Sequence, residues 1–164
     1  MAEESREPEI VSGREAFGGK LAELIAGAQM ELALFSLRLA QGLYSRMDVL
    51  DAVRQFALRS ERSHMRVLVA DARAATAGGN PFLEFARRLP SRVQLRELTP
   101  EKREIDGPER LIADRRRMLD LPGQERLEAM YYPEPATRVV ELSKDFDALW
   151  DESEPVIELT GMQL

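Results

Sequence analysis

The 164-residue chain contains no cysteine and a single histidine, His64. Without cysteine there is no disulfide, thiol nucleophile, iron–sulfur cluster or cysteine-bound zinc. One histidine excludes a metal site built on a histidine pair, so we expect no metal and no other cofactor. No apolar run approaches the roughly 18 residues of a membrane-spanning helix. The acidic start of the chain, MAEESREPE, is unlike a signal peptide. We therefore expect a cytoplasmic protein with no membrane contact, and we also expect it to be bacterial.

The net charge of −6 is unevenly distributed along the chain. Residues 1–9 carry −3 and residues 141–164 carry −6, which leaves +3 for residues 10–140. An acidic chain has little affinity for the nucleic-acid backbone, so we expect nucleic acid not to be a partner. The basic excess is greatest at Arg115, Arg116 and Arg117, which we predict as a local anion-binding site. The alternative is a solvated connection between two strands.

Hydrophobic periodicity predicts a single α/β domain. Apolar stripes at helical spacing predict helices over residues 14–28, 47–59, 81–89 and 135–152. Short apolar or alternating segments predict strands near residues 30–36, 65–70, 93–98, 110–114, 118–121 and 127–132. The early alternation of helix and strand predicts a mixed, mostly parallel sheet sandwiched between helices.

The two ends of the chain are expected to lie outside this domain. Residues 1–13 are polar and acidic, and we predict that they are disordered. The domain itself is predicted to span residues 14–152. Residues 153–164 are predicted to be a tail or an edge strand, with the strand placed at residues 156–159.

The order of these segments resembles one half of the phospholipase D superfamily fold. The resemblance covers residues 14–152 and rests on the segments ELALFS, MRVLVAD and VQLREL, followed by two consecutive strands. It also includes the closing segment SKDFDALW, in which Phe146 and Trp150 are one helical turn apart and are predicted to share a buried face. Active members of this superfamily combine two such units, so the resemblance implies a homodimer.

The catalytic signature of the family, H-x-K-x4-D, is degenerate in this chain. If Asp114 takes the aspartate position, the histidine position holds Gly107 and the lysine position holds Glu109. The resemblance implies that the histidine attacks phosphorus and that the lysine counters the phosphoryl charge. Glycine and glutamate can do neither. The sequence therefore predicts a non-catalytic phospholipase-D-like module that binds a partner protein or an anionic ligand.

Two alternative functions remain open at this point. His64, Arg66 and Asp71 match the signature spacing with arginine in place of lysine, although they lie two strands before its expected place. This match would make the protein a phosphodiesterase-type hydrolase that uses His64 at a dimer interface. The simpler interpretation is a histidine at the entrance of a strand that Asp71 ends. The second alternative is a weak nucleic-acid- or phosphate-binding domain that uses Arg115–Arg117.

Overall fold

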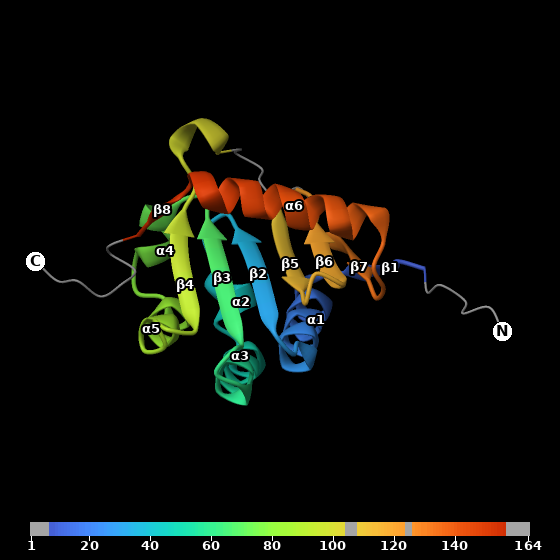
Figure 1. The fold of residues 1–164 in the computed structure, drawn as a ribbon, viewed down its shortest axis with the longest axis horizontal. Coiled ribbons are helices and arrows are strands. Elements are labelled where there is room, and N and C mark those ends of the chain that lie inside the picture. The colour runs from blue at the N-terminus through green and yellow to red at the C-terminus, as the bar shows by residue number, and fades with distance from the viewer. Residues whose placement is uncertain (1–6, 104–107, 124–125, 157–164) are drawn as a thin grey trace, which may run out of the picture.

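A single sheet organises the computed structural model, which describes residues 7–103, 108–123 and 126–156. Within these residues the strands follow the order β1-β7-β6-β5-β2-β3-β4-β8 (Figure 1). Their bounds are β1 Glu9–Ser12, β2 Glu31–Ser36, β3 His64–Val69, β4 Val93–Glu97, β5 Glu109–Ala113, β6 Arg117–Leu121, β7 Glu128–Tyr132 and β8 Glu154–Pro155.

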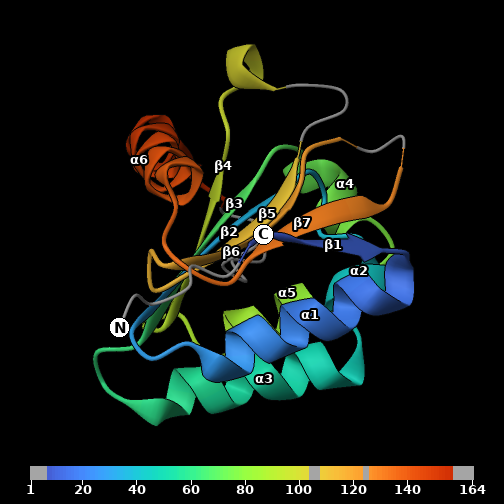
Figure 2. The same cartoon turned by 90° about the vertical axis from the view of Figure 1, so that its right-hand side faces the viewer.

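Helices cover both faces of the sheet. Their bounds are α1 Arg14–Gly27, α2 Gln41–Tyr44, α3 Met47–Arg59, α4 Ala72–Thr76, α5 Pro81–Arg87 and α6 Thr137–Glu152, with a short 3₁₀ turn at Pro100–Lys102. Figure 2 shows α1, α3 and α5 on one face and the long α6 on the other. The predicted α/β architecture, a mixed sheet between helices, is therefore confirmed. No helix in the described ranges is long and apolar enough to cross a membrane.

Parallel pairing is confined to three adjacent strands, β2, β3 and β4. Strand β3 pairs in parallel with both β2 and β4, whereas the other five strand pairs are antiparallel. The sheet is thus mixed, but it is not mostly parallel as the sequence suggested. Short connections account for two of the antiparallel pairs, since a connection as short as residues 114–116 between β5 and β6 can join only antiparallel neighbours, and β6 and β7 are likewise consecutive.

The N-terminal segment is ordered further than predicted. Residues 9–12, expected to be disordered, form β1 and pair antiparallel with β7. Val11 lies opposite Ala129 and is buried, whereas Ile10 is 65% exposed. At the other end, β8 pairs with Arg96 and Glu97 of β4. Most of the strand predicted at residues 156–159 lies outside the described residues.

The core consists of two apolar clusters, one on each face of the sheet. The larger cluster packs beneath α1, α2, α3 and α5, and the smaller one packs beneath α6. Phe146 and Trp150 belong to the smaller cluster, with ring centroids 5.9 Å apart and an interplanar angle of 19°. The prediction that these two rings share one buried face is confirmed.

Candidate functional site

The position at which the resemblance implies a lysine holds a buried carboxylate, Glu109, at the start of β5. Because β5 runs antiparallel to β2, Glu109 lies beside the C-terminal end of β2. Ser36 Oγ and Tyr44 OH each donate a hydrogen bond of 2.6 Å to Glu109 Oε1. The backbone N–H of Leu37 donates to Oε2 at 2.9 Å. We call these four residues, Glu109, Ser36, Leu37 and Tyr44, the Glu109 cluster.

Tyr44 is held in its neutral form by this environment. Burial raises the pKa of the Tyr44 phenol well above its ordinary value, and the negative charge of Glu109 and its hydrogen bond raise it further. The ring also packs edge-on against Phe82, with centroids 6.1 Å apart. A phenol fixed in this way remains a hydrogen-bond donor to Glu109 at every physiological pH.

The turn after β2 adopts an uncommon backbone conformation beside the cluster. Leu39 has a φ of +53°, a value that side chains rarely adopt, although its side chain is fully buried. Its N–H donates to Ser36 Oγ at 2.9 Å, and its carbonyl accepts from Asn80 Nδ2 at 3.0 Å. Ser36 therefore connects the strained turn to Glu109, so that the turn and the carboxylate position each other.

The chemistry of the cluster differs from that of a phosphoryl-transfer site. An ionised carboxylate accepts hydrogen bonds only and repels a phosphate, whereas a lysine would neutralise it. Glu109 is 4% exposed, and the donors of the cluster point at its oxygens rather than at solvent. In the part of the chain that the structure describes, no group of three or more metal-ligating side chains could hold a metal ion.

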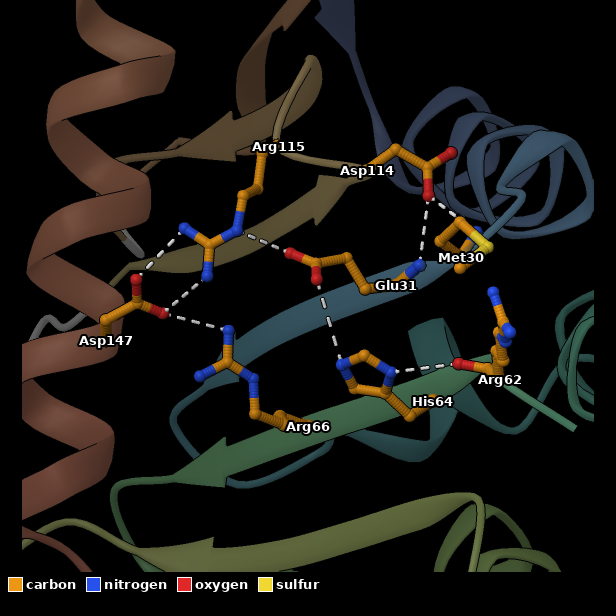
Figure 3. Close-up of polar contacts among 8 residues, drawn as sticks. All are labelled: Met30, Glu31, Arg62, His64, Arg66, Asp114, Arg115 and Asp147. Carbon is orange, nitrogen blue, oxygen red and sulfur yellow. Dashed lines mark hydrogen bonds and ion pairs between the residues drawn. The ribbon is translucent and has the colours of Figure 1, made fainter.

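The other described signature position, Asp114, lies at the opposite end of β5. Its carboxylate accepts the backbone N–H groups of Gln29, Met30 and Glu31 at 2.8–2.9 Å. Figure 3 shows the contacts with Met30 and Glu31. Burial alone would raise the pKa of Asp114, but these three amides and the charge of Arg117 lower it below its ordinary value. Asp114 thus joins the β5–β6 hairpin to the start of β2. Gly107 lies outside the described residues.

The alternative triplet His64, Arg66 and Asp71 is spread along β3. His64 begins the strand and Asp71 follows its end, roughly 20 Å away at about 3.3 Å per residue. Asp71 accepts the N–H of Ala74 at 3.0 Å and caps α4. Arg66 donates to Asp147 of α6 at 2.9 Å. Within one chain, the structure therefore does not bring these three side chains together.

His64 itself contacts the neighbouring strand. Its Nε2 lies 3.8 Å from an oxygen of Glu31, and its Nδ1 lies 3.2 Å from the carbonyl oxygen of Arg62 (Figure 3). The side chain is exposed at the edge where β2 and β3 begin. It is far along the sheet from the Glu109 cluster, which lies where β2 ends.

Arg115, Arg116 and Arg117 have different surroundings. Arg115 binds Glu31 at 2.7 Å and Asp147 at 2.9 Å, so it connects β2 to α6 (Figure 3). Arg117 donates to the carbonyl oxygen of Gly27 at 3.1 Å. Arg116 is exposed, and it forms no hydrogen bond or ion pair with a side chain among the described residues. Only the guanidinium of Arg116 is therefore available to bind an anion at this turn, because Arg115 and Arg117 already bind groups of the described chain.

Sequence reasoning missed the residues that surround Glu109. Ser36 and Tyr44 are 73 and 65 positions away from Glu109 in the chain, and no local pattern connects them. Asp147 was missed for a similar reason, since its partners Arg66 and Arg115 lie on distant strands. The one available indication was the acid at the lysine position, which requires donors if it is buried.

Comparison with known proteins places the chain in a family. Residues 13–162 match the family model described as a domain of unknown function, DUF7931. The chain belongs to the DUF7931 family. Among curated proteins, none matches its sequence.

Solved structures show which fold this DUF7931 chain has. It is similar to Nuc from Salmonella typhimurium, a phospholipase D family member, with a TM-score of 0.60 and 12% identity over 92% of this chain and 99% of that chain. It is similar to NucT from Helicobacter pylori, with a TM-score of 0.62, 10% identity and the same coverage. The phospholipase-D-like fold that the resemblance implied is therefore confirmed.

A third similar structure is TrmBL2, an archaeal chromatin protein described as having a novel mode of DNA binding. The TM-score is 0.62 and the identity 18%, over 92% of the DUF7931 chain. The chain spans only 54% of the TrmBL2 chain. At such low identities, all three similarities concern the fold alone.

Proposed function

We propose that this protein is a non-catalytic phospholipase-D-like module of the cytoplasm that binds a partner protein or an anionic ligand. The observation that carries the proposal is the Glu109 cluster. A buried carboxylate, held by two hydroxyls at 2.6 Å and a backbone amide at 2.9 Å, stands where the resemblance implies the phosphate-binding lysine. A negative group at that point destabilises the charge that develops in phosphoryl transfer.

The positions of the other candidate groups support the same proposal. The hydrolase alternative needs His64 to act together with groups that its own chain places elsewhere, because Asp71 caps α4 beyond the far end of β3. That alternative would therefore require a second copy to complete the site around His64. A nucleophile needs an orienting or charge-neutralising partner within hydrogen-bond distance.

A hydrolysis assay tests this proposal directly. The purified protein should not hydrolyse bis(p-nitrophenyl) phosphate, a phosphatidylcholine vesicle or single-stranded DNA above the rate of buffer alone. His64→Ala is the matched variant, because His64 is exposed and its loss should not unfold the domain. Hydrolysis that disappears in this variant would overturn the proposal in favour of the His64 alternative. Hydrolysis that persists would overturn it as well, and would assign the activity to another residue.

A second candidate function, weak binding of nucleic acid, is favoured by one observation. The fold is shared with TrmBL2, which is described as binding DNA, and Arg116 is an exposed guanidinium in the predicted anion-binding turn. Fluorescence anisotropy with a labelled DNA duplex at low salt tests this candidate. If it holds, affinity should fall steeply as salt rises and should weaken in Arg116→Glu. No binding at low salt would remove the candidate.

We also propose that the protein is a homodimer, because related active units work in pairs. An interface between identical copies is two-fold symmetric and uses the same surface twice. Sedimentation equilibrium at tens of micromolar should give twice the chain mass of 18.6 kDa. A single species of the chain mass would contradict the dimer and leave the proposed binding role unaffected.

A further inference from the structure

A cavity of about 260 Å³ lies at the outer part of the sheet, beside β4. It is separated from the Glu109 cluster by the width of β2 and β3. Its walls are largely apolar and come from four elements, with Ala86 of α5, Val93 and Leu95 of β4, Trp150 of α6 and Pro155 of β8. A concave apolar surface of this kind, close to an edge of the fold, is typical of small-molecule sites.

The cavity is accessible because β8 covers only part of β4. Strand β8 pairs with Arg96 and Glu97, and no other described strand pairs with the outer edge of Val93–Leu95. Leu98 donates its N–H to the carbonyl oxygen of Val69 in β3. Successive residues of a strand direct their backbone groups to opposite sides, so the N–H and C=O of Leu95, three residues earlier, point away from β3. The edge of β4 therefore offers polar backbone groups beside the apolar walls.

Two guanidinium groups line the cavity, and no acidic residue is among its described lining residues. Arg96 is held in place, since its Nε donates to Ser153 Oγ at 2.8 Å and its guanidinium lies 5.3 Å from the Trp150 ring centroid. Arg87 is exposed, and its guanidinium forms no hydrogen bond or ion pair with another described residue. Two arginines and no described acidic side chain at the cavity favour binding of an anion there, although the chain as a whole has a net charge of −6.

We propose that this cavity binds a small amphipathic anion, with its apolar body against Trp150 and its carboxylate or sulfonate group on Arg87. Burial of the apolar body supplies affinity, and a charge-assisted hydrogen bond from Arg87 supplies the preference for an anion. This inference rests on the proposed binding role, for which it names the chemical class of the ligand and the place where it binds.

The single tryptophan of the chain makes the cavity directly observable. The probe is 8-anilinonaphthalene-1-sulfonate, an aromatic body with one sulfonate. Excitation of Trp150 should give saturable energy transfer to the dye when the dye enters the cavity. Octanoate should displace the dye at concentrations where octan-1-ol does not, because only octanoate carries the anionic group.

Arg87→Gln should weaken dye binding about tenfold, the loss expected for one charge-assisted hydrogen bond. Arg88→Gln is the matched control, since Arg88 is the exposed neighbour on the same surface and does not line the cavity. Both substitutions are at exposed positions, and unchanged melting temperatures would show that both variants are folded. Selective weakening in Arg87→Gln supports the site.

Three results would overturn the inference. These are the absence of saturable transfer from Trp150, equal weakening in both arginine variants, and displacement by octan-1-ol as effective as that by octanoate. Each concerns the cavity alone. Hydrolysis of a phosphodiester would instead overturn the proposed non-catalytic role while leaving dye binding intact, so the two failures are distinguishable.

Discussion

The face of the sheet beneath α1, α3 and α5 is built mainly from apolar side chains such as Phe17, Leu21 and Phe56, each at most 1% exposed. The buried carboxylate on this face, Glu109, is bound by hydroxyl groups. The opposite face, beneath α6, combines a smaller apolar cluster with charged groups. Arg66 there donates to Asp147 at 2.9 Å, and its guanidinium lies 4.9 Å from the Phe146 ring centroid. The helical layers thus use different interactions to cover one sheet.

The two faces contribute differently to the stability of the fold and to the position of its helices. Apolar burial is non-directional and contributes about 25 cal/mol per Å² of surface, so the larger cluster supplies most of the folding free energy. Ion pairs such as those of Asp147 with Arg66 and Arg115 contribute little net energy but require defined geometry. We infer that the apolar face holds the domain together and that the charged contacts set the position of α6.

The largest effect is expected on the apolar face. Phe56→Ala should lower the free energy of unfolding by about 3–5 kcal/mol, because Phe56 is fully buried and its removal leaves a cavity. Urea unfolding followed by far-UV circular dichroism measures this loss. Leu58→Ala on the same helix is the control, since Leu58 is 72% exposed and its change should be within about 0.5 kcal/mol. Equal losses in the two variants would contradict the assignment of the core to this face.

A smaller loss is expected beneath α6. Trp150→Ala should cost about 3 kcal/mol, the lower end for a buried aromatic ring, because Trp150 is 8% exposed and borders the β4 cavity. Circular dichroism is again the measurement, since the variant has no tryptophan to fluoresce. Val140→Ala, at a position of α6 that is 44% exposed, should change little. A loss for Trp150→Ala greater than that for Phe56→Ala would reverse the comparison of the two faces.

The smallest effect concerns the charged contacts, and it depends on pH. Burial raises the pKa of Asp147, but hydrogen bonds from Arg115 and Arg66 and their charges lower it below its ordinary value. A lowered folded-state pKa adds stability above the unfolded-state pKa, and this stability is lost as the pH falls through the folded-state pKa. Asp147→Asn should therefore cost under about 1 kcal/mol at neutral pH and nothing in strong acid.

Unfolding curves of Asp147→Asn at neutral and acidic pH provide this measurement. Asp145→Asn is the matched control, because Asp145 is an exposed neighbour on the same helix without a described ion pair. A cost for Asp147→Asn that is the same at both pH values would show that the two arginine contacts do not stabilise α6.

Much of the fold followed from local patterns, because helices and strands have distinct hydrophobic periods. The stacked pair Phe146 and Trp150 is an example, since residues four apart share a helix face. Strand β1 was missed because four residues in an acidic segment, with Ile10 exposed, show no clear alternation. Short strands depend on a partner elsewhere in the chain, here β7.

The site was predictable only in part, for a geometric reason. The acid at position 109, where the resemblance implies a lysine, is visible in the sequence, whereas its donors Ser36 and Tyr44 approach only when β5 pairs with β2. Sequence spacing was also a poor guide for His64 and Asp71. His64 begins β3 and Asp71 follows its end, so the extended strand separates the two side chains.

The pairing of β5 with β2 has a consequence for synthesis on the ribosome. Ser36 and Glu109 are 73 positions apart, so β2 leaves the ribosome long before β5. Strands β2, β3 and β4 pair with one another in parallel, and all three are synthesised before β5. Until β5 arrives, the apolar strand ELALFS has one open edge. An unprotected edge is a template for pairing with other chains, and this edge of β2 is covered only when β5 docks and Asp114 accepts the amides at the start of β2.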